Sequence, residues 1–162
     1  MTLRRFLLSH KISFVVSSLL LLGGIVLFLH HTQATSSTVA TRDAKRISDL
    51  QQVQNQLEMY FNKCGYYPGG VYPGPICALW IYNSTWETMR AALVDSKLGV
   101  SSIPNDPSPG MSYFYGSEVG GKGYALGAAL EDPTNPALAQ GAHGLINSVE
   151  CFGSMYCVHV SK

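Results

Sequence analysis

Two segments near the start of the chain decide the fold: ISFVVSSLLLLGGIVLFL at residues 12–29 and RDAKRISDLQQVQNQLEMYFNKC at residues 42–64. The first segment has no charged residue, and it is just long enough for the ~20 apolar residues that a helix needs to cross a bilayer. The second repeats apolar residues every three or four positions, which is typical of an amphipathic helix. Together they predict a long N-terminal helix that lies half in a membrane and carries a small domain.

Basic residues precede the apolar segment at Arg4, Arg5 and Lys11. Because positive charge stays in the cytoplasm, we expect residues 1–11 to be cytoplasmic, residues 12–30 to span the cell membrane once, and the rest to be extracytoplasmic. A cleavable signal peptide is the alternative, with Thr32-Gln33-Ala34 as a small-residue cleavage site. Its apolar region is normally about 7–15 residues long, so the longer run favours a retained anchor.

The apolar segment contains the pair Gly23 and Gly24. Small residues let the backbones of membrane helices approach closely. We therefore expect these two glycines to be the helix-packing positions of the span.

We expect residues 31–64 to form the extracytoplasmic half of the long helix. We expect the stretch from Val53 to Phe61 to pack on the following domain, and Gly65 suits the left-handed conformation that ends a helix. If that stretch faces the domain, the charged residues Asp43, Arg46 and Asp49 fall on the other faces of the helix, where we expect water to surround them. The predicted apolar stripe consists of Ile47, Leu50, Val53, Leu57, Tyr60 and Phe61.

We expect residues 65–162 to form one globular head. The fold class is α+β, in which the long N-terminal helix packs on a small antiparallel sheet. Ser84 or Thr85 can cap a short helix. Its predicted face is Trp86, Met89, Arg90, Leu93 and Val94. Strands are expected at 111–115 and 124–130, and a hairpin at 149–160 around Gly153-Ser154.

The segment GSEVGGKG at residues 116–123 nearly matches a phosphate-binding loop. Its last position is glycine instead of serine or threonine, and a strand follows it instead of the helix that a phosphate site requires. We interpret the segment as a hairpin tip.

Composition excludes some functions. The net charge is +1 and charged residues make up 13% of the chain, which gives no electrostatic basis for binding nucleic acid. The sequence contains no GxSxG, HExxH or CxxC motif. We therefore predict that the protein is not an enzyme.

The chain has four cysteines, and the predicted topology places all of them where disulfides persist. Four cysteines allow three connectivities, of which we favour the pairing of sequence neighbours, Cys64 with Cys77 and Cys151 with Cys157. The second pair would close a C-terminal disulfide loop. A metal site is the alternative, although the spacings lack the usual CxxC knuckle.

Residues 42–54 and the segment LEMYFNKCGYYP at residues 57–68 resemble the pilin and pseudopilin family of type IV pili and type II secretion, most closely its major pseudopilin. IPNDP at 103–107, YFY at 113–115 and GYALGAALE at 123–131 are similar to the sheet region of the same family. The resemblance implies a structural subunit whose partners are other pilin-like subunits, the secretion or pilus assembly machinery, and the membrane.

The leader departs from the family pattern, since SHKISF at residues 9–14 replaces the glycine cleavage site and the glutamate that follows it. Major pseudopilins also bind calcium through a loop whose aspartate is missing from Gly127-Ala128-Ala129-Leu130. No cofactor is predicted, although Glu131 and Asp132 offer the oxygen ligands that calcium prefers. The expected function is a pilin-like structural or accessory subunit, and the alternative is a membrane-anchored extracytoplasmic binding domain that does not polymerise.

Overall fold

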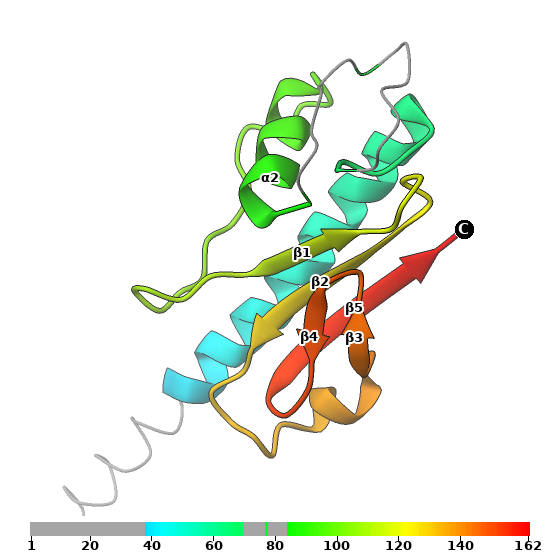
Figure 1. Ribbon diagram of the computed structural model, residues 1–162. Helices are drawn as coiled ribbons and strands as arrows, with labels where there is room; N and C mark the ends of the chain where they lie inside the picture. Colours follow the sequence, from blue (N-terminus) through cyan, green and yellow to red (C-terminus); the bar gives the residue numbers. More distant parts are fainter. Residues whose placement is uncertain (1–37, 70–76, 78–83) are drawn as a thin grey trace, which may run out of the picture. The chain divides into compact units, whose positions relative to one another are not determined.

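The computed structural model describes residues 38–69, 77 and 84–162. The predicted cytoplasmic N-terminus, the predicted span with Gly23 and Gly24, and the possible cleavage site lie outside these residues. Among the described residues, no helix combines the length and the hydropathy needed to cross a bilayer. The chain divides into two compact units, Met1–Val39 and Ala40–Lys162, and every element labelled in Figure 1 belongs to the second.

The long helix is described over residues 38–64 and is drawn in cyan to green in Figure 1. Its buried positions recur at steps of three and four, as the helical period of 3.6 residues requires. The helix ends as predicted at Gly65, which has a φ of +81° and donates its N–H to the carbonyl of Phe61 at 2.7 Å. The buried positions are Asp43, Arg46, Asp49, Leu50, Val53, Leu57, Tyr60 and Cys64.

Three strands form an antiparallel sheet in the order β1-β2-β5: β1 is Phe114–Ser117, β2 is Gly123–Ala129 and β5 is Met155–Ser161. A tight hairpin joins β1 to β2, with the N–H of Glu118 bonded to the carbonyl of Gly123 at 2.8 Å. The stretch that nearly matches a phosphate loop is this hairpin, and a strand follows it as predicted. The long helix and the small antiparallel sheet confirm the α+β class.

The sheet has two covered faces because side chains alternate along each strand. Tyr124 and Leu126 of β2 join the core formed with the long helix, which lies behind the sheet in Figure 1. Ala125, between them, joins a second small core with Val149 and the disulfide cysteines on the opposite face. One face of the sheet therefore packs on the helix, and the other packs on the small sheet that contains β4.

The predicted C-terminal hairpin is wrong in its pairing. β4 (Val149–Cys151) pairs with β3 (Gly144–Ile146) in a separate two-stranded sheet, whereas β5 pairs with β2 over its whole length. Asn147 and Ser148 turn between β3 and β4 with φ of 49° and 66°, the left-handed conformation of a two-residue hairpin. Before β3, a short 3-10 helix, η1, covers Pro136–Gln140.

The β3–β4 turn lies directly against β1 at Gly116. A Cβ atom at this glycine would come within 1.7 Å of the Asn147 carbonyl oxygen, so only glycine allows this approach. The small sheet is thereby seated on the larger one.

The short helix α2, Trp86–Asp95, begins where the sequence predicts. Thr85 caps it: its hydroxyl accepts the N–H of Thr88 while the Thr88 hydroxyl accepts the N–H of Thr85, a reciprocal capping box. Its buried face includes Ala92, whereas Val94 is exposed, so the predicted face was wrong at Val94.

Candidate functional site

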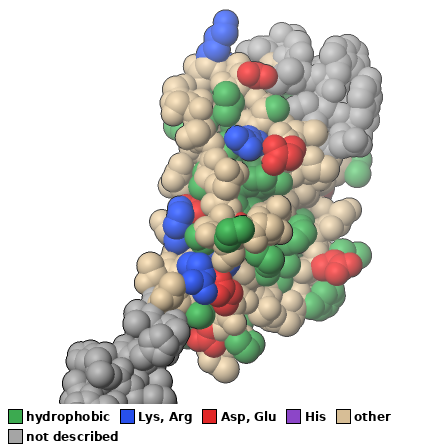
Figure 2. Space-filling view, turned by 90° about the vertical axis from the view of Figure 1, so that its left-hand side faces the viewer, with side chains coloured by type: hydrophobic (Ala, Val, Ile, Leu, Met, Phe, Trp, Pro, Cys, Tyr) green, Lys and Arg blue, Asp and Glu red, His purple; other side chains and the backbone are tan. Residues whose placement is uncertain are grey.

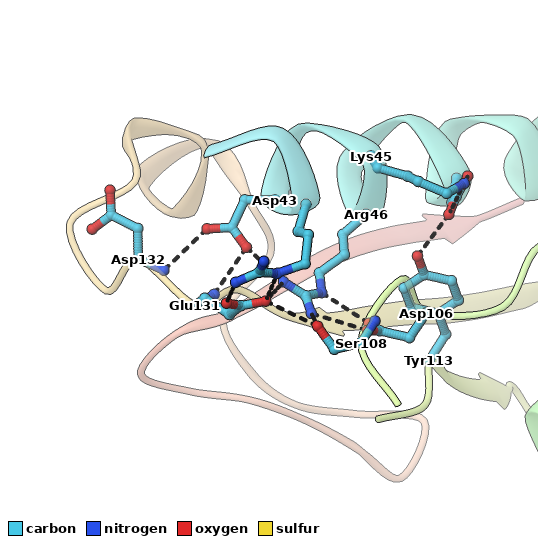
Figure 3. A network of polar contacts seen from close by, with 10 residues as sticks. Asp43, Lys45, Arg46, Asp106, Ser108, Tyr113, Glu131 and Asp132 are labelled. Atoms are coloured by element: carbon cyan, nitrogen blue, oxygen red, sulfur yellow. Dashed lines mark hydrogen bonds and ion pairs between the residues drawn. The ribbon is translucent and has the colours of Figure 1, made fainter. Parts of the chain in front are cut away.

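The most highly organised polar site among the described residues is centred on Arg46, whose side chain is fully buried (Figure 3). Its Nε and Nη2 donate to the two carboxylate oxygens of Asp106 at 2.8 and 2.9 Å. Nη1 donates to Asp43 at 2.8 Å and to Glu131 at 2.7 Å, and Nη2 also donates to the Ser108 hydroxyl at 2.8 Å. The five N–H donors of a guanidinium group are thus all used. We call Arg42, Asp43, Arg46, Asp106, Ser108 and Glu131 the Arg46 cluster.

Asp43 fastens the turn after β2 to the helix. Its carboxylate accepts the backbone N–H groups of Glu131 at 2.9 Å and of Asp132 at 3.0 Å, in addition to its bond from Arg46. Glu131 also receives Arg42, whose Nε donates to Oε1 at 2.7 Å and whose Nη2 contacts Oε2. Arg42, Asp43 and Arg46, all within about one helical turn, therefore bind the turn at residues 131–132.

A second polar contact lies one turn further along the helix, at Asp49 (Figure 3). The buried hydroxyl of Tyr113 donates to the Asp49 carboxylate at 2.7 Å, and Lys45 donates to the same carboxylate at 2.9 Å. Burial and the bond to Asp49 raise the pKa of Tyr113 above its usual value. The segment leading into β1 is thereby tied to the helix through the phenol of Tyr113.

The electrostatics of the Arg46 cluster favour its charged state. Hydrogen bonds from Arg42 and then Arg46 lower the pKa of Glu131 to about 2. Burial alone would raise the pKa of Asp106, but bonds from Arg46 and from the backbone of Ser108 outweigh it, so that pKa lies below its usual value. The bonds to Asp106, Glu131 and Asp43 raise the pKa of Arg46 despite burial. Arg46, Asp106 and Glu131 are therefore ionised at neutral pH.

What this arrangement does chemically is join segments. Arg46 connects the helix to the loop at residues 106–108 and to the turn at residues 131–132. Its donors and acceptors satisfy one another inside the protein, which is the condition for burying charge without a large penalty. The cluster is thus a structural tie, and it presents no uncommitted acid or base for catalysis.

The expectation that water surrounds Asp43, Arg46 and Asp49 was wrong. Their exposed fractions are 0%, 0% and 5%. A signal for this was present, because Asp43 and Arg46 continue the buried stripe from Leu50 at steps of four and three. An apolar pattern alone assigns such residues to the outside, whereas partners distant in the sequence let them lie inside.

Both predicted disulfides are confirmed. Cys64 pairs with Cys77, with Cα atoms 5.6 Å apart, and Cys151 pairs with Cys157, with Cα atoms 5.9 Å apart. The first ties the end of the long helix to the segment after it. The second joins β4 of the small sheet to β5 of the large one, so it is a link between sheets and not a staple within one hairpin.

The residues proposed as calcium ligands are engaged elsewhere. Both carboxylate oxygens of Glu131 bind Arg42 and Arg46, and Asp132 accepts the N–H and the hydroxyl of Thr134 at 2.8 and 2.6 Å. A calcium ion at Glu131 would have to displace two guanidinium groups. Across the described part of the chain, no group of three or more His, Cys, Asp or Glu side chains is placed to hold a metal. These contacts do not fit a calcium site.

The other end of the long helix is aromatic. Tyr67 donates to Glu58 at 2.7 Å, and its ring lies edge-on to Tyr124 with centroids 4.6 Å apart. Lys162 forms an ion pair with Glu58 at 2.6 Å and lies 4.1 Å from the centre of the Phe61 ring. The last residue of the chain therefore packs on the helix, at a cation–π distance.

Several large apolar side chains are exposed on the head. They include Phe114 of β1 at 45% exposure, Leu145 of β3 at 68% and Phe152 at 61%. Figure 2 shows hydrophobic side chains near the middle of one face, with charged groups around them on several sides. Exposed apolar side chains mark an interaction surface where they are contiguous.

Comparison with protein-family models, with curated proteins and with solved structures gave no match.

Proposed function

We propose that this chain is a pilin-like structural or accessory subunit of a type IV pilus or type II secretion pseudopilus. The observation that carries the proposal is a long helix that buries one stripe, Leu50 to Tyr60, against a small antiparallel sheet. The segments that resemble the family, residues 42–68 and 123–131, are the ones that build this interface. The proposal thus combines a motif and an architecture that agree with each other.

The proposed topology follows the charge of the N-terminus. Residues 1–11 are cytoplasmic, residues 12–30 cross the cell membrane, and the head with its two disulfides is extracytoplasmic. Val119, at 85% exposure, is a suitable labelling position. In cells expressing Val119→Cys, a thiol reagent that cannot cross the cytoplasmic membrane should label the protein without lysis. Labelling that requires lysis contradicts this topology.

The proposed partners are other pilin-like subunits, contacted through the N-terminal helix at Gly23 and Gly24. A photo-crosslinking amino acid at position 26 should capture a pilin-like subunit in cells. Replacing both glycines with leucine should abolish that capture while membrane insertion persists, because leucine prevents close backbone approach. Replacing Leu20 and Leu21 with isoleucine is the matched control and should leave the crosslink unchanged.

A monomeric membrane-anchored binding domain is the second candidate. The departed leader at residues 9–14 favours it, since the family glutamate is absent, and the exposed side chains of Phe114, Leu145 and Phe152 offer a surface for a partner. If the probe at position 26 captures no pilin-like subunit in the unmodified chain, this second function replaces the first. Neither candidate includes an enzymatic reaction, a nucleic-acid partner or a bound cofactor.

A further inference from the structure

The long helix is attached to the head by two different kinds of contact along its length. Before Leu50, the fully or almost fully buried side chains are Asp43, Arg46 and Asp49, all charged. From Leu50 onward the buried side chains are Leu50, Val53, Leu57 and Tyr60, and these belong to the main apolar core. The boundary between the two attachments falls within a single helical turn.

The charged attachment is organised around one cation. Arg46 lies among Asp43, Asp106 and Glu131, whose side chains are 0%, 2% and 30% exposed. If Arg46 loses these contacts, like charges are left facing one another with little water, which is strongly unfavourable. The contacts of the cluster are therefore expected to form and break together.

We propose that the Arg46 cluster is a latch: residues 42–49 of the helix detach from the head as one unit while residues 50–64 stay packed. Detachment lets the carboxylates and the guanidinium groups regain water, so it costs less than exposing the apolar stripe. Local openings of this kind occur in contiguous segments with few buried apolar contacts. Ile47 is partly buried, but it is not among the side chains packed on either apolar core.

The charged and titratable groups that face the latch come from each element packed against it. The helix contributes Arg42, Asp43, Lys45, Arg46 and Asp49. The loop before β1 contributes Asp106 and the Tyr113 hydroxyl, and the turn after β2 contributes Glu131. Low pH should therefore open the latch by removing carboxylate charge, since carboxylates are the groups among these that titrate below neutrality.

Opening releases residues 42–49 from the head, so the packed part of the helix begins near residue 50 instead of near residue 42. These eight residues span on the order of 12 Å as a helix, and more when they fray. The latch itself is a property of the head and does not depend on the proposed function. Only its use as an adjustable stalk for a membrane-anchored subunit rests on that function.

Hydrogen–deuterium exchange of the full chain in a non-ionic detergent tests the latch, because helical residues that lose their tertiary contacts fray readily and their amides then exchange. Arg46→Met should speed exchange in residues 42–49 at least tenfold and change residues 53–60 less than twofold. Arg46→Lys should give an intermediate effect in the same segment, because it restores the charge without the forked hydrogen bonds. Arg90→Met is the matched control and should change neither segment, since the ion pair of Arg90 within the described residues, with Glu87 at 3.6 Å, is exposed.

Glu131→Gln provides a milder variant in case Arg46→Met does not fold. It should speed exchange in residues 42–49 about two- to tenfold and leave residues 53–60 unchanged. Equal acceleration in both segments, or no change in residues 42–49, would overturn the latch. Because no arm of this experiment involves another subunit, its failure leaves the crosslinking test of the proposed function intact.

Discussion

Residues 42–49 and residues 50–64 belong to one continuous helix, yet the head holds them by different chemistry. The first segment is fixed by directed hydrogen bonds of 2.7–2.9 Å between charged groups. The second is fixed by apolar side chains such as Leu57 and Val53, which are 0% exposed. The comparison shows that burial along one helix face does not imply one kind of stabilisation.

The two attachments should also differ in what breaks them. Apolar burial is not directional and contributes about 25 cal/mol per Å² removed from water. A buried ion network contributes little net free energy relative to apolar residues of the same shape, but losing one member is costly because the others stay charged. The apolar segment is therefore expected to carry the stability of the head, and the charged segment to respond to its surroundings.

The largest expected effect is in the apolar segment. Leu57→Ala should lower the free energy of unfolding by about 3–5 kcal/mol, because it leaves a cavity beneath a fully buried position. Urea denaturation followed by circular dichroism measures this loss. Gln52→Ala, at an exposed position of the same helix, is the control and should change stability by less than about 0.5 kcal/mol. Comparable losses for the two variants would contradict the assignment of the core.

Next in size is the centre of the charged segment. Arg46→Met should lower the free energy of unfolding by about 3 kcal/mol, the lower end of the range for breaking a buried ion pair. We expect the lower end because the carboxylates left without a partner can reach water when the latch opens. The same denaturation experiment gives the value, with Arg90→Met as the exposed control. A stability equal to that of the unmodified protein would mean that apolar replacement satisfies the cluster.

Acid should weaken the charged segment through Glu131. The pKa of Glu131 is lowered to about 2 in the folded protein, so its contribution is fully present above its unfolded pKa of about 4.3. That contribution is lost as the pH falls from there through about 2. The unmodified protein should therefore lose more stability between pH 6 and pH 3 than Glu131→Gln does. Glu87→Gln, which changes an exposed ion pair, is the control and should lose as much stability as the unmodified protein. If all three proteins show the same dependence of stability on pH, this linkage is refuted.

The smallest effect is expected at the rim of the charged segment. Lys45 pairs with Asp49 at 2.9 Å, but the lysine side chain is 52% exposed. Lys45→Ala should change the free energy of unfolding by about 0–1 kcal/mol, as exposed pairs usually do. High salt should reduce even this difference, whereas a loss above about 2 kcal/mol would place Lys45 inside the latch.

Much of the fold could be predicted from the sequence because its signals are local. The apolar stripe from Leu50 to Tyr60, the cap at Thr85 and the hairpin tip near Gly120 each depend on a few neighbouring residues. The two disulfides also join cysteines that are close in the sequence, at separations of 13 and 6.

The Arg46 cluster could not be predicted in this way. Arg46 is 60 residues from Asp106 and 85 from Glu131, so the sequence near the arginine does not show that these two acceptors are available. The prediction of a hairpin at residues 149–160 failed for a related reason. The left-handed turn at Asn147-Ser148 lacks the usual glycine, and β5 has a longer partner in β2 than any that β4 offers. Tertiary pairing overrode the local pattern at both places.

The most direct test of the difference between the two segments is native-state hydrogen exchange of the unmodified full chain at increasing low urea concentrations. Local opening exposes little surface and is nearly independent of urea, whereas global unfolding depends on it steeply. The two-part attachment predicts that amides in residues 43–49 exchange through openings that urea hardly affects. Amides in residues 53–60 should instead follow the urea dependence of global unfolding. Exchange of both segments along one urea-dependent line would contradict the account.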